Sequence, residues 1–157
     1  MPDKPTYLGL LNAIALAEAR AHRYLNVWID VTPDPDVRAV LQKVAWREAE
    51  HGMSFAKRID ELGFTLRQKE DPGAEDDLAV AGSTEMSDVE KMEHFGLNSL
   101  DRVLGAFDDI FKDHTIDIRT GELLGRYVAE EFDTARLLRQ CYATLCAARA
   151  EAAGAPA

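Results

Sequence analysis

The sequence predicts an all-α protein: a four-helix bundle in which two antiparallel helix pairs are joined by a long crossover connection. Apolar residues recur at helical spacing in four long stretches, and no stretch alternates as a half-buried strand would. Proline and glycine are scarce inside these stretches and cluster between them. A length of 157 residues suits a single domain, 1–157, with room for a substantial core.

Four helices follow from this periodicity and from the residues that bound it. The first covers about residues 6–29, and the Val-Thr-Pro-Asp-Pro-Asp stretch after it supplies a stop and a cap for the next helix. The second covers about 36–62 and is followed by Gly63, a natural C-terminal stop. The third covers about 87–111 and the fourth about 120–148.

The segment 64–86 differs from the helical stretches. It contains Pro72, Gly73, Gly82 and an acidic run, which predicts a connection much longer than ordinary helix–helix loops. A connection of this length can carry the chain from one end of a bundle to the other.

Charge and composition exclude several classes of partner. The net charge of -10 does not favour nucleic acid or an anionic membrane. The chain has no run of 18 apolar residues, so we expect no membrane span, and Met1–Pro5 lacks the features of a signal peptide, so we expect the cytoplasm. Cys141 and Cys146 are five residues apart and point to different helix faces, which does not favour a disulfide or a zinc clip.

Glutamates interrupt the apolar stripes of the predicted helices. At about 100° per residue, Glu18, Glu48 and Glu93 lie within roughly 20° of apolar residues on their own helices. Glu130 and Glu131 straddle the stripe of the fourth helix, so either could face inward. A charged carboxylate in a core costs several kcal/mol unless it is paired or bound to a cation. Carboxylates that converge from several helices are most simply explained by a metal site.

The positions of these carboxylates along the bundle can also be compared. Glu18 and Glu48 lie about fifteen residues on either side of the first helix–helix loop, so an antiparallel hairpin brings them to one height. Around the last loop, Glu93 and Glu130 are about 21 and 16 residues away, and Asp101 is about 13 away. Asp101 lies roughly 80° from the inward direction. We therefore favour Glu93 as the ligand on the third helix and keep Asp101 as its rival.

A histidine accompanies one of these glutamates. His51 follows Glu48 by three residues, so both lie on one helix face and can offer an oxygen and an imidazole to one ion. The other interpretation of His51 is a rim residue bonded to a neighbour. Glu90 also has two interpretations: it completes a capping box that begins at Ser87, or it serves as a further ligand beside Glu93.

Taken together, these features resemble the ferritin-like superfamily, and within it most the erythrin domain of rubrerythrins, which binds two irons. The resemblance covers about residues 8–145. It rests on Glu18, the Glu-Ala-Glu-His motif at 48–51, the long crossover, Glu93 and the Val-Ala-Glu-Glu-Phe stretch at 128–132.

The resemblance implies a ferritin-like bundle and a particular ligand set. By this match the bridging carboxylates fall on Glu48 and Glu130, and the terminal ligands on Glu18, His51 and Glu93. Glu131 is then the neighbour of a ligand rather than a ligand itself.

This chain departs from the family in two ways. Asp133 stands where the family has its second histidine; an aspartate can bind iron but favours oxygen-type coordination, which affects the second metal position. The chain also has no Cys-x-x-Cys pair, so the rubredoxin module that feeds electrons in rubrerythrins is missing. A peroxidase of this kind needs another protein as its electron donor.

Three functions remain open at this stage. The first is a di-metal oxidoreductase that holds two iron ions, or manganese, and acts on peroxide or dioxygen. The second is a small iron-binding or ferroxidase protein. The third is a degenerate ferritin-like scaffold or binding domain without a complete metal site. We expect a homodimer in which exposed bundle edges pair.

Overall fold

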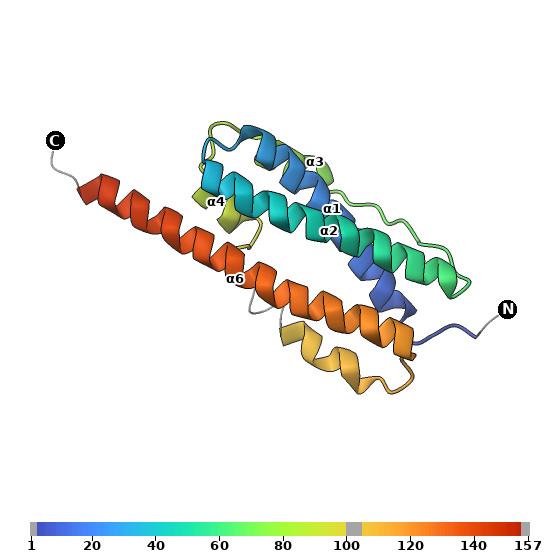
Figure 1. Ribbon diagram of the computed structural model, residues 1–157. Helices are drawn as coiled ribbons and strands as arrows, with labels where there is room; N and C mark the ends of the chain where they lie inside the picture. The colour runs from blue at the N-terminus through green and yellow to red at the C-terminus, as the bar shows by residue number, and fades with distance from the viewer. Residues whose placement is uncertain (1–2, 100–104, 155–157) are drawn as a thin grey trace.

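The computed structural model describes residues 3–99 and 105–154, and within those ranges the chain is helical and contains no strand (Figure 1). The prediction of an all-α class is confirmed. The elements are α1 (Leu8–Val31), α2 (Pro35–Glu61), α3 (Ala74–Gly82), α4 (Asp88–His94), the 3-10 helix η1 (Ala106–Lys112) and α6 (Ile118–Gly154).

Helices α1 and α2 form an antiparallel hairpin, and its boundaries have local causes. The Asp34 carboxylate accepts hydrogen bonds from the backbone N–H groups of Asp36 and Val37, and Pro35 occupies the first turn, where its missing N–H is not needed. At the other end of α2, Gly63 adopts a φ of 83°, and the N–H groups of Gly63 and Phe64 bond back to the last turn. The predicted stop at Gly63 is therefore present.

The connection 64–86 runs the length of this hairpin (Figure 1). Near its start, the Asn12 amide on α1 donates to the Arg67 carbonyl at 3.0 Å and accepts from the Arg67 N–H at 2.7 Å. Its second half forms α3, which packs on α1. At its end, Asp88 accepts from Trp28 Nε1 and Thr32 Oγ1, each at 2.7 Å, at the opposite end of α1.

The predicted third helix, 87–111, is wrong as a continuous element. Helix α4 has seven residues and ends because Gly96 adopts a φ of 67°. The Leu97 N–H bonds to the Met92 carbonyl at 2.9 Å, and the Gly96 N–H to the Glu93 carbonyl at 3.1 Å, the pattern of a helix C-terminus. The next helix whose bounds lie within the described residues is η1, while Leu100, Leu104 and Asp101 lie outside them.

Helix α6 is longer than predicted and packs against the hairpin along its side (Figure 1). Glu93 of α4 contacts Tyr142 in the C-terminal half of α6. Phe107 of η1 contacts Tyr127 in the N-terminal half of α6. The two short elements thus stand against opposite halves of α6, where one long helix was expected. In the described part of the chain, no helix has both the length and the apolar character needed to cross a membrane.

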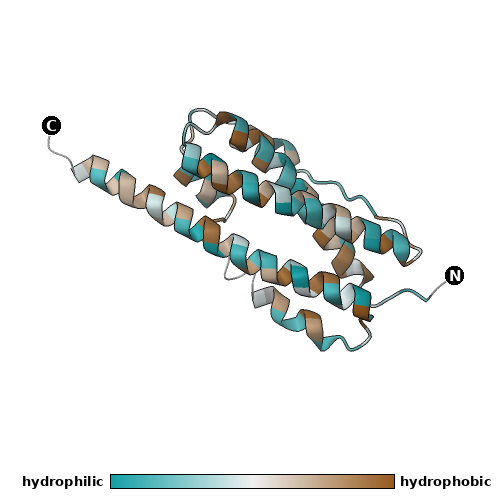
Figure 2. Cartoon of the chain, viewed as in Figure 1, coloured by the Kyte–Doolittle hydropathy of each residue, from teal (hydrophilic) through white to brown (hydrophobic). Residues whose placement is uncertain are grey.

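The apolar core is divided into two clusters along the helices, and hydrophobic and hydrophilic residues are interspersed along each helix (Figure 2). One cluster lies toward the α1–α2 loop and includes Leu25, Trp28, Ile29, Val37, Leu41, Val44, Ala45, Met92 and Leu138. The other lies toward the start of α1 and includes Tyr7, Leu11, Ile14, Ala15, Phe55, Ile59, Ile110, Leu124 and Tyr127. Between them, α1, α2 and α6 all carry charged or polar side chains into the interior.

The glycine that ends α4 offers a test of the broken third helix. Gly96→Ala should lower the free energy of unfolding by about 1 kcal/mol, because an L-residue is strained at a left-handed φ. Nothing lies within 4 Å of an added Cβ at Gly96, so crowding does not contribute. The control is Gly125→Ala in α6, which is equally uncrowded and should stabilise the protein by up to about 1 kcal/mol. Urea unfolding measures both; a stabilising Gly96→Ala would show that the helix continues through this position.

Candidate metal centre

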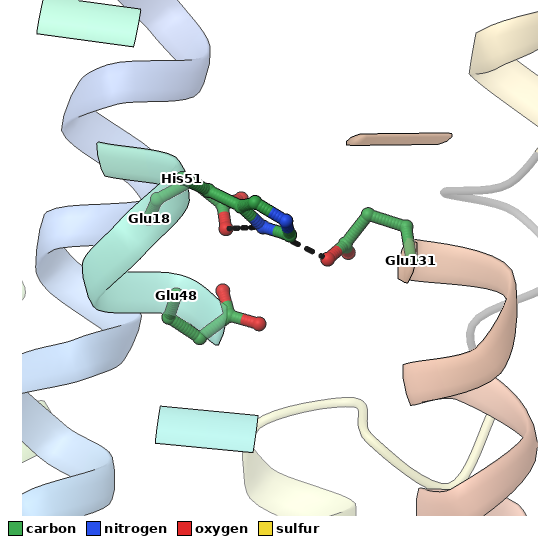
Figure 3. A group of neighbouring side chains, drawn as sticks. All are labelled: Glu18, Glu48, His51 and Glu131. Atoms are coloured by element: carbon green, nitrogen blue, oxygen red, sulfur yellow. Dashed lines mark hydrogen bonds and ion pairs between the residues drawn. The ribbon is translucent and has the colours of Figure 1, made fainter. Parts of the chain in front are cut away.

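Four side chains from three helices meet in the polar layer between the two apolar clusters. Glu18 comes from α1, Glu48 and His51 from α2, and Glu131 from α6. One ligand atom from each lies within 4.8 Å of the others. Figure 3 shows the α1 and α2 side chains facing Glu131 across the interior. This group could hold a metal ion.

Close approach of α1 and α2 brings the first three residues together. A Cβ built on Gly52 would lie 3.4 Å from the Ala19 nitrogen and 3.6 Å from the Ala15 carbonyl oxygen, so small residues face each other here. Glu18 and Glu48 are 5% and 6% exposed, and His51 is fully buried. The helical repeat places these side chains on the buried faces, as the stripe pattern predicts.

His51 lies between carboxylates at both ring nitrogens. Its Nδ1 is 3.2 Å from Glu18 Oε2 and 3.7 Å from Glu131 Oε1, and its Nε2 is 2.5 Å from Glu130 Oε2. Burial acts to lower the pKa of His51, but the carboxylates outweigh it and the net shift is upward. In the metal-free protein the ring therefore favours the doubly protonated form, with one N–H for each side.

Tyr127 of α6 fixes the orientation of the Glu18 carboxylate. Its hydroxyl donates to Glu18 Oε1 at 3.1 Å, and its ring meets the His51 ring edge-on at a centroid distance of 5.0 Å. Burial, followed by the neighbouring carboxylates, raises the pKa of Tyr127, so its hydroxyl stays protonated and acts as a donor. Glu18 Oε1 is thereby occupied, while Oε2 faces His51.

The charges of Glu48 and Glu131 are only partly compensated. Glu131 Oε1 is a buried oxygen without a hydrogen-bond partner, and it is the one such side-chain atom among the described residues. Burial raises the pKa of Glu131 to about 7, and the nearby Glu18 adds to the rise. Burial also raises the pKa of Glu48 well above its ordinary value, again helped by Glu18. The metal-free site therefore binds protons that a cation would replace.

Arg47 lies beside this group on the seam between α2 and α6. Its guanidinium donates to Asp133 Oδ2 at 2.7 Å and to Thr134 Oγ1 at 3.1 Å. It opposes the rise in the pKa of both Glu48 and Glu131. Arg47 is thus the nearest cationic side chain that acts on both carboxylates.

The structure does not bring every predicted ligand to the group. Glu93 accepts from the Tyr142 hydroxyl at 2.7 Å near the far end of α6, because α4 ends before it reaches the centre. Glu90 bonds to the Ser87 N–H and hydroxyl in the capping box, which was one of its two interpretations. Asp133 holds two arginines instead of facing the group. Asp101 lies outside the described residues.

Two neighbours on α6 lie at different places relative to the group. Glu131 lies in it, whereas Glu130, which the resemblance assigns as a ligand, contacts the outer nitrogen of His51. The stripe pattern alone left both open. Tyr127 is not among the predicted site residues; its spacing of four residues from Glu131 is the signal that it belongs to the same layer.

Comparison of the chain with models of protein families, with characterised proteins and with solved structures finds no match. Any function of this protein is therefore inferred from the geometry of the site.

The raised pKa values predict how pH affects the metal-free protein. Between about pH 5 and 7.5 the folded state holds protons on Glu48, Glu131 and His51 that the unfolded chain releases, so stability should fall as pH rises. Carboxylates whose pKa is lowered, such as Asp117, give their full contribution above pH 5 and do not alter this trend. Urea unfolding in the presence of a chelator measures it.

The control for this prediction is Glu131→Gln, which keeps the shape but cannot ionise and should flatten the pH dependence. Stability of the wild-type protein that is constant or rises from pH 5.5 to 7.5 would contradict the assignment of these buried protons.

Proposed function

We propose that Glu18, Glu48, His51 and Glu131 form an iron centre, and that the protein is an oxidoreductase that acts on peroxide or dioxygen. The observation that carries the proposal is the buried Glu131 Oε1, which has no hydrogen-bond partner and faces two buried carboxylates and an imidazole. A cation among them satisfies this oxygen and removes the repulsion between the carboxylates.

The spacing of the donor atoms supports an ion of ordinary size. Bond lengths near 2.1 Å place opposite ligand atoms of an octahedral ion roughly 4.2 Å apart. The four donor atoms already lie within 4.8 Å of one another, so small side-chain rotations are enough to close the shell. Four protein ligands also leave two octahedral positions for solvent or a small oxidant.

The type of donor supports iron among the common metals. Three carboxylate oxygens with one imidazole nitrogen combine the ligands that iron and manganese both accept. The absence of thiolates in the group does not favour a structural zinc site. Manganese suits the same donors, and the proposal of iron rests on the further proposal of redox chemistry.

The surrounding residues have distinct roles in this centre. The Tyr127 hydroxyl holds Glu18 Oε1, which leaves Glu18 Oε2 free to face the ion. Glu130 accepts the Nε2 proton of His51, so that the Nδ1 lone pair points inward. A carboxylate behind a ligating histidine fixes its tautomer and ring orientation. Glu130 thus supports the ligand and is not part of the inner group.

The reaction follows from a redox-active ion in a buried site. When bound, iron would supply one-electron transfer to an oxidant placed at its open positions. Reduction of hydrogen peroxide to two waters consumes two electrons and two protons, and we propose that a separate protein donates these electrons.

The metal-free scaffold remains the second candidate, and specific contacts favour it. Glu93 and Asp133, two of the expected ligands, have other partners, and His51 with Tyr127 already satisfies part of Glu18. In that case Glu48 and Glu131, whose pKa values are raised by burial, would keep their protons to a higher pH than exposed glutamates do. Metal binding decides between the two candidates.

Glu48→Gln should lower the affinity for ferrous iron by 10-fold or more, because it replaces a charged ligand with a neutral amide of the same shape. Anaerobic titration followed by elemental analysis measures binding, and the melting temperature of the wild-type protein should rise when the ion is added. The matched control is Glu93→Gln, the expected ligand that lies outside the group, which should bind iron as the wild-type protein does.

Loss of iron in Glu93→Gln together with retention in Glu48→Gln would move the site away from the group described here. Negligible iron binding by the wild-type protein and by both variants would favour the metal-free scaffold. The iron-loaded wild-type protein should also consume peroxide with an added reductant, and iron binding without such turnover would favour an iron-binding protein.

A further inference from the structure

We infer that the Arg47 guanidinium takes the place of a second cation in this centre, so that the protein binds one metal ion per chain where the resemblance implies two. The inference rests on the proposed function, because it concerns how many ions the same carboxylates hold. It assigns to Arg47 a role in determining metal stoichiometry.

Arg47 lies where α2 and α6 meet, beside the carboxylates. It precedes Glu48 on α2, and its guanidinium spans the seam to Asp133 and Thr134 of α6, two and three residues beyond Glu131. The side chain is 23% exposed, so the charge lies at the edge of the buried layer rather than in open solvent. It lies between the helices that supply Glu48 and Glu131.

Asp133 is already paired with two arginines. It stands at the sequence position where the resemblance places a second histidine ligand, yet both of its oxygens are engaged: Oδ2 with Arg47 at 2.7 Å and Oδ1 with Arg136 at 2.7 Å. The two arginines hold the pKa of Asp133 below its ordinary value, as expected for a carboxylate that is already paired. To bind an ion, Asp133 would have to give up both arginines.

The count of charges also favours one ion. With Glu130, which lies against His51, the five carboxylates of the layer carry five negative charges when ionised. One divalent ion with Arg47 and Arg136 supplies four positive charges and compensates nearly all of them. A second divalent ion beside both arginines would give this partly buried site an excess positive charge, which is unfavourable.

The supply of donors agrees with the charge count. The four atoms within 4.8 Å of one another are enough for one ion, and Glu130 is held by the outer nitrogen of His51. Among the described residues, no further carboxylate or imidazole joins the group. Removal of Arg47 would take one positive charge from the layer and leave Asp133 Oδ2 without its partner, with the exposed Arg136 alone on Oδ1, and both changes favour a second ion.

The test is a titration of the metal-free protein with Mn²⁺ in a calorimeter. Elemental analysis of the protein after desalting then gives the number of bound ions per chain. The wild-type protein should bind about one ion per chain, and Arg47→Gln about two. Arg47→Lys keeps the positive charge and should bind about one. Arg136→Gln removes the exposed partner of the same aspartate and leaves Arg47 in place, so it should also bind about one.

The outcomes separate this inference from the proposed function. Two ions in the wild-type protein, or one ion in a folded Arg47→Gln, would overturn the role of Arg47 and leave the metal centre intact. No binding by any of the four proteins would overturn the metal centre itself. Circular dichroism establishes that each variant is folded, and the wild-type stoichiometry tests the inference even if Arg47→Gln does not fold.

Discussion

The burial of acidic side chains in the middle of a helical core is the constraint on which the rest of this structure depends. Glu18 and Glu48 are almost fully buried between two apolar clusters, and Glu131 faces them from α6. An apolar residue at each position would give one continuous core and more stability. Because charged groups are expensive to bury without compensation, their presence in one layer of three helices is the basis on which we propose a metal site.

Neighbouring side chains compensate part of the negative charge of these buried carboxylates. Tyr127 and His51 hold Glu18, Glu130 holds the outer face of His51, and Arg47 acts on Glu48 and Glu131. Protons on Glu48 and Glu131 complete the balance in the metal-free state. One oxygen remains without a partner, and it points into the group. A single divalent ion fits this deficit in charge and in donor atoms.

Much of the fold, and three of the four residues of the candidate site, can be predicted from the sequence because periodicity reports directly on burial. The stripe positions of Glu18, Glu48 and His51 place them in one layer, and Gly63 and the capping box at Ser87 mark real helix ends. Periodicity failed where a local backbone preference overrode it. Gly96 ends α4 although apolar spacing continues past it. Glu93, which lies before this glycine, contacts Tyr142 and not the group.

Other parts could not be predicted because they depend on distances between helices. Whether Glu130 or Glu131 faces inward is decided by the rotation of α6, which a stripe pattern fixes only to within one residue. The pairing of Asp133 with Arg47 requires knowledge of which helix lies beside α6. Sequence analysis assigned Asp133 to a metal because the family pattern has a histidine there, whereas across the α2–α6 seam it meets a guanidinium.

The most direct test of a metal centre in this layer is anomalous X-ray diffraction from crystals of the wild-type protein grown with Mn²⁺. The account predicts one anomalous peak in the interior, at roughly 2.0–2.3 Å from His51 Nδ1 and from oxygens of Glu18, Glu48 and Glu131. A crystal with no peak in this layer at saturating Mn²⁺, or with its peak beside Glu93, would contradict it.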